Sequence, residues 1–288
     1  MKNMIPLVMM LFLFEIVAGQ HISEFEGMSP ASKDTDLHLP PSHSFQFIIE
    51  KGEPLDGGGS LPGQCDFAGY VPRQNSSKYG VLSVNSETVP GAVTLLDLEF
   101  DDVSGKWIIK DSNAVDFDFN TVAEDTFPGI VGSTLANCSG TVTPWNTIIS
   151  CEEYTVDDIL SRYPGTPESA FKVDKDSDGY DVYGWAIEID PLTKEVINQD
   201  GGRNAQDKLW ALGNFKHENA VVHENRRTVY QGADATNGEG YLFKFVADQE
   251  ENLSSGDLYV YKGDKKTNHS WIQIANKTIA EQNSTRDQ

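Results

Sequence analysis

Positive charge is scarce in this sequence of 288 residues. Lysine and arginine together number 22, against 44 aspartates and glutamates, which gives a formal net charge of −22 at pH 7. The electric field of a protein with this negative charge repels phosphate backbones and anionic lipid surfaces. The composition therefore argues against nucleic acid and against a membrane as partners. It also attracts divalent cations, and this directs attention to clusters of metal-binding side chains.

Long apolar runs are nearly absent. The one exception lies at the N-terminus, where Lys2 precedes an apolar run from Ile5 to Phe14 and small residues occupy positions 17–19. This run is too short to span a bilayer, and the order of a charge, an apolar segment and small residues is typical of a secretory signal. The sequence therefore predicts a signal peptide over residues 1–19, a secreted protein and no membrane-spanning segment.

Helical periodicity is also rare, apart from a candidate turn over 156–162. The clearest pattern is the alternation of Leu96 to Phe100, followed by turn residues and a returning strand at Trp107 to Ile109. Further short strands are predicted over 147–153, 183–190, 196–197, 220–222, 228–230, 241–246, 258–261 and 271–274. After a flexible, proline-containing leader over 20–43, the sequence thus predicts one all-β domain of antiparallel strands over 44–288.

A weak repeat suggests how these strands are arranged. Trp107, Trp185 and Trp271 are each followed by alternating β-branched residues, at a spacing of roughly eighty residues, which equals about two four-stranded blades. The spacing favours a β-propeller, although periodicity alone does not distinguish a propeller from a sandwich.

The segment 137–153 combines a thiol, Cys138, with two adjacent carboxylates, Glu152 and Glu153. Because side chains alternate along a strand, the two glutamates point to opposite faces, and we favour Glu153 as the one that faces the thiol. The alternative is a disulfide between Cys138 and Cys151, with both glutamates at a solvated strand end. If Cys138 binds a metal instead, Cys65 and Cys151 either pair or stay reduced.

Four aspartates at nearly alternating positions are typical of the start of a calcium-binding loop. They are Asp174, Asp176, Asp178 and Asp181. Gly179 would supply the sharp turn, but Trp185 occupies the position where an EF-hand has its glutamate. A plain acidic turn is therefore the alternative.

Other charged residues are ambiguous by themselves. Glu188 interrupts an apolar strand, where a carboxylate is costly unless it is paired, metal-bound or solvated. Lys216, Glu218 and Asp234 lie in polar segments that are typical of exposed turns.

Taken together, these segments resemble the PhoX-type alkaline phosphatases from about residue 45 to the end of the chain. The matching pieces are Asn137–Gly140, Thr143–Trp145, Cys151–Glu153, Gly184–Pro191, Gly213–Ala220, Gly232–Asp234 and Tyr241–Val246. The resemblance implies a β-propeller of four-stranded blades that hydrolyses small phosphorylated metabolites with ferric iron and calcium in its channel. It implies Lys216 as the phosphate contact, with Cys138 as the iron thiolate. The implied metal residues are Cys138, Glu152, Glu153, Glu188, Glu218 and Asp234.

Several departures from the family pattern weaken that expectation. Lys216 replaces an arginine, and a point charge holds phosphate less specifically than a planar fork. Ala233 replaces an acid, while Thr141 and Asn146 replace glycines. Family members also continue further, so the resemblance implies an incomplete propeller that a second chain would complete. The alternative to a phosphatase is a non-catalytic, acidic, calcium-binding secreted protein.

Six Asn-x-Ser/Thr sequons indicate a glycoprotein. They begin at Asn75, Asn137, Asn252, Asn268, Asn276 and Asn283.

Overall fold

The computed structural model describes residues 37–40, 44–117, 134–155, 158, 161, 183–197, 208–234, 240–264 and 266–277. The chain divides into two units, Met1–Gln46 and Phe47–Gln288. In the first unit the described residues have no regular secondary structure. The predicted signal peptide, most of the leader, the aspartate-rich segment 174–181 and most of the candidate helical turn lie outside the described residues.

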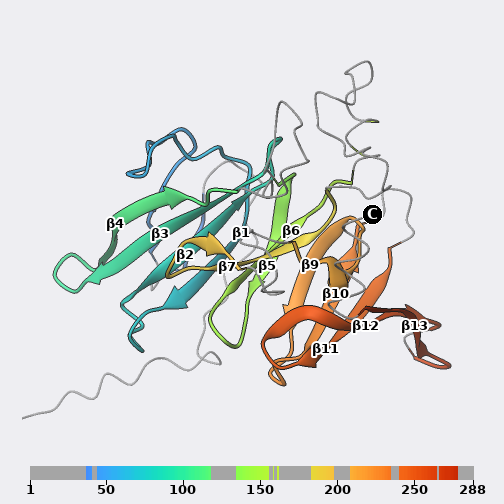
Figure 1. Cartoon of the computed structure of the whole chain (residues 1–288). Coiled ribbons are helices and arrows are strands. Elements are labelled where there is room, and N and C mark those ends of the chain that lie inside the picture. Colours follow the sequence, from blue (N-terminus) through green and yellow to red (C-terminus); the bar gives the residue numbers. More distant parts are fainter. Residues whose placement is uncertain are drawn as a thin grey trace, which may run out of the picture. The chain divides into compact units, whose positions relative to one another are not determined.

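The described part of the second unit consists of three antiparallel sheets (Figure 1). The first contains β1 (Cys65–Pro72), β2 (Tyr79–Ser86), β3 (Ala92–Asp101) and β4 (Lys106–Ala114). The second contains β5 (Asn137–Val142), β6 (Ile148–Glu152), β7 (Ala186–Asp190) and β8 (Glu195–Val196). The third contains β9 (His217–Val222), β10 (Thr228–Ala233), β11 (Leu242–Gln249), β12 (Asn252–Lys262) and β13 (Ser270–Lys277), preceded by the short 3-10 helix η3 (Trp210–Leu212). The predicted all-β antiparallel class is confirmed.

The hairpin of β3 and β4 shows why alternation identified strands. Phe100 pairs with Trp107 across the hairpin, and their rings meet edge to face at 5.4 Å. The Asp101 carboxylate accepts hydrogen bonds from the backbone of the turn, where Gly105 has a φ of 67°. Side-chain packing and turn chemistry therefore specify the same register.

Two apolar layers lie between the sheets. Val81, Val93 and Leu95 of the first sheet pack with Ile187 and Ile189 of the second. The second and third sheets share another layer, which includes Cys138, Ile149, Cys151, Ala220, Val229, Phe245 and Leu258. The middle sheet is therefore buried on both faces, which explains why every residue of β6 is buried.

A third cluster covers the other face of the first sheet. Leu96 and Leu98 of β3 are buried there against Leu61, with Ile48 and Ile49 packed beside them. The segment that precedes β1 thus supplies apolar cover for this face.

The first strands of the three sheets are neighbours, because β5 contacts both β1 and β9. This arrangement brings residues that are far apart in the sequence to one place. Three sheets do not by themselves establish a closed ring, so the described residues define an all-β fold without defining a propeller. Among the described helical segments, none combines the length and apolar character needed to cross a bilayer.

Candidate metal centre

A β-bulge in β5 holds the thiol of Cys138. Cys138 and Ser139 together stand opposite the single residue Cys151 of β6, because pairing shifts by one residue at this point. A Cβ atom on Gly140 would lie 2.2 Å from a backbone oxygen of β6, so the two backbones approach closely here. The buried Asn85 amide donates to the carbonyl oxygens of both bulge residues, at 2.9 and 3.0 Å.

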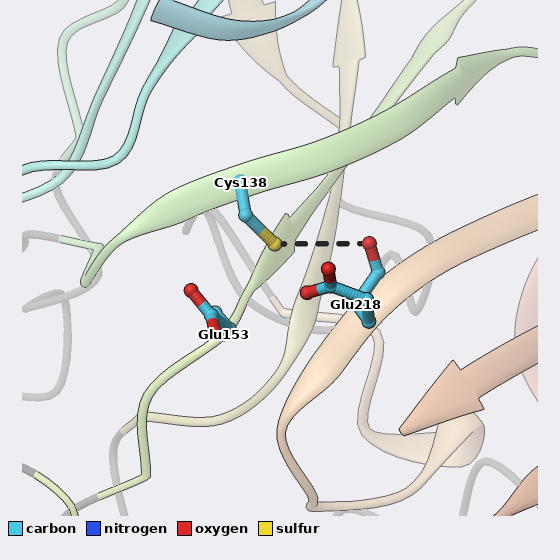
Figure 2. A group of neighbouring side chains, drawn as sticks. All are labelled: Cys138, Glu153 and Glu218. Atoms are coloured by element: carbon cyan, nitrogen blue, oxygen red, sulfur yellow. Dashed lines mark hydrogen bonds between the residues drawn. The ribbon is translucent and has the colours of Figure 1, made fainter. Parts of the chain in front are cut away.

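Three side chains of types that can bind a metal converge on this bulge (Figure 2). The sulfur of Cys138 and one carboxylate oxygen each from Glu153 and Glu218 all lie within 4.8 Å of one another. The thiol is buried, Glu153 is half-buried and Glu218 is exposed. The group therefore has one buried end and one end open to solvent.

Backbone contacts fix each member of the group. Glu153 directly follows β6, and its amide donates to the carbonyl oxygen of Ala136 at 3.1 Å. Glu218 lies in β9, beside β5. The Cys138 thiol donates to the carbonyl oxygen of His217 at 3.0 Å, with a longer contact of 3.9 Å to the Glu218 carbonyl oxygen.

The carboxylates crowd one another. Burial raises the pKa of Glu153 to about 7, with further contributions from Glu87, Glu218 and Asp234. Burial and the neighbouring acids likewise raise the pKa of Glu218, against a smaller lowering effect of Lys216. The group thus favours uptake of positive charge, whether a proton or a metal ion.

Burial also raises the pKa of the Cys138 thiol well above its ordinary range, and the nearby Cys151, Glu218 and Glu153 add to the shift. A thiolate forms here only with a cation beside it, because a coordinated thiol loses its proton. A soft sulfur next to hard carboxylate oxygens fits a transition metal near the sulfur and calcium near the oxygens. The side chains present therefore fit the metals that the sequence motifs imply.

Lys216 and Asp234 adjoin this group. The Lys216 ammonium lies 3.4 Å from a carboxylate oxygen of Asp234 and 3.4 Å from one of Asp158. The backbone amide of Asp234 donates to the Lys216 carbonyl oxygen at 3.1 Å. The Asp158 carboxylate accepts hydrogen bonds in turn from the amide and hydroxyl of Thr155.

Glu152 has a different partner from its neighbour Glu153. Both of its oxygens lie 2.9 Å from the buried Lys208 ammonium, and they also accept the backbone amides of Leu135 and Trp185. The expected divergence of the two glutamates is observed. The structure does not bring Glu152 to the Cys138 group, and gives it a structural ion pair instead.

Glu188 is also engaged away from the group. It is 1% exposed, and its carboxylate accepts hydrogen bonds from the Trp145 indole at 2.7 Å and the Thr147 hydroxyl at 2.5 Å. The structure therefore contradicts the interpretation of Glu188 as a solvated strand residue. It shows a buried carboxylate with hydrogen-bond donors, outside the group of three.

All three cysteines, each of which lies among the described residues, are free thiols. The alternative of a disulfide between Cys138 and Cys151 is therefore not what the structure contains. Cys65 is exposed, whereas the other two are buried.

Sequence reasoning missed two acids near the group, Asp66 and Glu87. Burial and the charge of Glu87 raise the pKa of Asp66, and the Tyr154 hydroxyl donates to Glu87 at 3.3 Å. The two acids adjoin because Cys65 of β1 pairs with Ser86 of β2. Recognition of these two strands in the sequence would have placed both acids at one sheet end.

Residues 112–288, more than half of the chain, match the family model of alkaline phosphatase PhoX. This chain belongs to the PhoX alkaline phosphatase family. No curated protein and no solved structure matches it.

The PhoX match confirms the family that the sequence motifs indicated. It includes Cys138, Glu153 and Glu218, together with Lys216. Strands β1 to β3, and with them Asp66 and Glu87, precede the matched residues. The chain is thus an alkaline phosphatase-like protein whose converging side chains all lie in the family-matched part.

Proposed function

We propose that this PhoX family member is a secreted, metal-dependent phosphomonoesterase that holds iron and calcium at Cys138, Glu153 and Glu218. Membership of the family supports phosphatase activity. The observation that carries the metal assignment is the convergence of one thiol and two carboxylates within 4.8 Å. Small phosphorylated metabolites are the proposed substrates.

The acidic surroundings explain why metal ions are needed. A phosphomonoester carries negative charge, and the carboxylates around Cys138 would repel it. Bound cations supply the positive charge that stabilises the phosphoryl oxygens and the leaving oxygen. In this proposal Cys138 gives up its proton to bind as a thiolate, and Glu153 and Glu218 contribute carboxylate oxygens.

Lys216 is the proposed phosphate contact. Its ammonium is positioned by Asp158 and Asp234, each at 3.4 Å, and a lysine offers a point charge to a phosphate oxygen. Asp234 would orient Lys216 and add negative charge beside the metals.

We also infer that the three sheets are blades of a β-propeller. Contacts of β5 with β1 and with β9 support this, because the first strands of adjacent blades lie beside one another in a propeller. The proposed metal-binding side chains come from β5, from the end of β6 and from β9.

Metal analysis combined with a phosphomonoester assay tests the proposal. The purified protein is expected to contain iron and calcium and to hydrolyse a chromogenic phosphate monoester. Cys138→Ser should lower iron affinity by about tenfold or more, whereas Cys65→Ser removes an exposed thiol and should leave iron and turnover unchanged. Because Cys138 is buried, Glu218→Gln provides a second test at an exposed position.

A non-catalytic calcium-binding protein is the second candidate. The observation that favours it is the pairing of Lys216 with two carboxylates, which offsets the charge needed to hold a phosphate. Calcium without iron, together with no turnover of any phosphomonoester, would establish this candidate and refute the first.

A further inference from the structure

The fold distinguishes among the Asn-x-Ser/Thr sequons by the accessibility of their asparagines. Four of the six, at Asn75, Asn137, Asn252 and Asn268, have described side chains. A glycan is bulky and hydrated, so the native protein carries one only where the asparagine amide faces solvent.

Two sequons occupy exposed turns. Asn75 lies between β1 and β2, and Asn268 lies between β12 and β13, each with an exposed side chain. Both residues have positive φ, 56° and 45°, a conformation that asparagine adopts more readily than most residues. Ser77 and Ser270, which complete the sequons, are exposed as well.

Asn137 has the opposite environment. It is fully buried; its amide nitrogen donates to the Ser150 hydroxyl at 2.9 Å, and its oxygen accepts the Thr134 hydroxyl. Even a methyl group on Gly91 would lie 2.1 Å from that oxygen. A sugar on Asn137 would displace this packing next to Cys138.

Asn252 is an intermediate case. It is half-buried, and its side-chain oxygen accepts hydrogen bonds from the amide and hydroxyl of Ser254. Its sequon serine is therefore already engaged by the Asn252 side chain.

We propose that native protein from a glycosylating secretory compartment carries N-linked glycans at Asn75 and Asn268 and none at Asn137. In the transfer, the asparagine nitrogen forms a bond to the anomeric carbon of a lipid-linked oligosaccharide. The bond from that carbon to pyrophosphate breaks, the amide gives up one proton, and the lipid pyrophosphate leaves. No oxidant or reductant is involved.

The burial of Asn137 matters when the chain folds, after the glycan has been transferred. Sequons are modified on an extended chain, so a chain that receives a glycan at Asn137 cannot complete the packing between β5 and β6. Such chains are lost from the native pool. Neither exposed turn contributes a residue to the Cys138, Glu153 and Glu218 group, so glycans at those turns leave the group accessible.

Site mapping in a eukaryotic secretory host tests this assignment. The full chain is recovered, protease-resistant native material is selected, and glycans are removed enzymatically in ¹⁸O water, which marks each formerly glycosylated asparagine as labelled aspartate. Asn75 and Asn268 should be labelled, and Asn137 should not. Asn75→Gln and Asn268→Gln should each increase gel mobility by one glycan step.

Ser139→Ala serves as the control, because it removes the buried sequon and retains Asn137; mobility should be unchanged. Label at Asn137 in native material, or absence of label at Asn75 or at Asn268, would overturn the proposal. The proposal shares with the proposed function only the entry into a secretory pathway; its readout does not depend on metal binding or phosphatase activity, so failure of either leaves it intact.

Discussion

The buried ion pair of Glu152 and Lys208 predicts a large loss of stability when the lysine is replaced. Their side chains are 0% and 3% exposed, and the Glu152 carboxylate would retain only two backbone donors in a Lys208→Met variant. Breaking a buried pair on one side costs about 3–5 kcal/mol. That is a large share of the roughly 5–15 kcal/mol that stabilises a typical domain.

The pH dependence of this loss follows from the direction of the Glu152 pKa. Burial raises it, and Lys208 is the main influence that lowers it. Without the lysine the pKa rises further, so the folded variant takes up a proton that the unfolded chain does not hold. The destabilisation should therefore be larger at alkaline than at acidic pH.

Urea denaturation followed by tryptophan fluorescence measures the effect. The matched control is Lys78→Met, which breaks the exposed pair of Lys78 and Asp102 and should cost less than about 1 kcal/mol. The double variant Glu152→Gln with Lys208→Met should be more stable than Lys208→Met alone, because it leaves no buried charge. Equal losses for Lys208→Met and Lys78→Met would refute the reasoning.

Three further variants test the core and the site. Phe245→Ala removes a fully buried ring between the second and third sheets and should lower the free energy of unfolding by about 3–5 kcal/mol in urea titrations. Trp145→Phe leaves buried Glu188 without its indole donor and should cost about 1–3 kcal/mol in the same assay. Lys216→Arg offers a planar fork to phosphate and should lower KM by about fivefold, equivalent to about 1 kcal/mol, whereas Lys216→Met should raise KM. An unchanged KM in both Lys216 variants would exclude this residue as the phosphate contact.

Strands with strict alternation were predictable, and those with buried polar residues were not. Leu96 to Phe100 reads as a strand because its apolar residues alternate. Strand β2 was missed because its polar residues Ser83, Asn85 and Ser86 are fully buried. The pattern of polar and apolar residues therefore does not show which face of this strand is exposed. Strand β5 was missed because its small and polar residues resemble a loop.

The same limit applies to the metal centre. Cys138 and Glu153 were candidates from side-chain chemistry, whereas Glu218 was expected from the family resemblance alone, and the structure brings all three together. The partner of Glu152 was not predictable, because Lys208 is 56 residues away in the sequence and only the packing of the second sheet brings the two together. Local pattern reports the chemistry of a residue, whereas its partner depends on the tertiary fold.

The burial of Glu153, together with the crowding of acids around it, predicts that the metal-free protein loses stability as the pH rises. The pKa of Glu153 is about 7 in the folded protein, against 4.5 for an unperturbed glutamate. Between these values the folded state binds more protons than the unfolded state, so the free energy of unfolding falls as pH increases. The stabilising contribution is fully present below 4.5 and is lost as the pH rises through 7.

The buried His217 changes the free energy of unfolding with pH in the opposite direction, over a pH range that partly overlaps the range of Glu153. Burial lowers its pKa to about 4 from 6.5, so its contribution is present above 6.5 and is lost as the pH falls through 4.

The comparison of wild type with Glu153→Gln isolates Glu153, because both proteins retain His217. In chelator, their urea midpoints should nearly coincide at about pH 5, and wild type should become the less stable of the two at about pH 8. Calcium added at the higher pH should raise the midpoint of wild type more than that of the variant, since the cation replaces the missing proton. A gap between the two proteins that is independent of pH would mean that neither burial nor the neighbouring acids perturb the pKa of the Glu153 carboxyl, and the proposed cation site would lose its electrostatic basis.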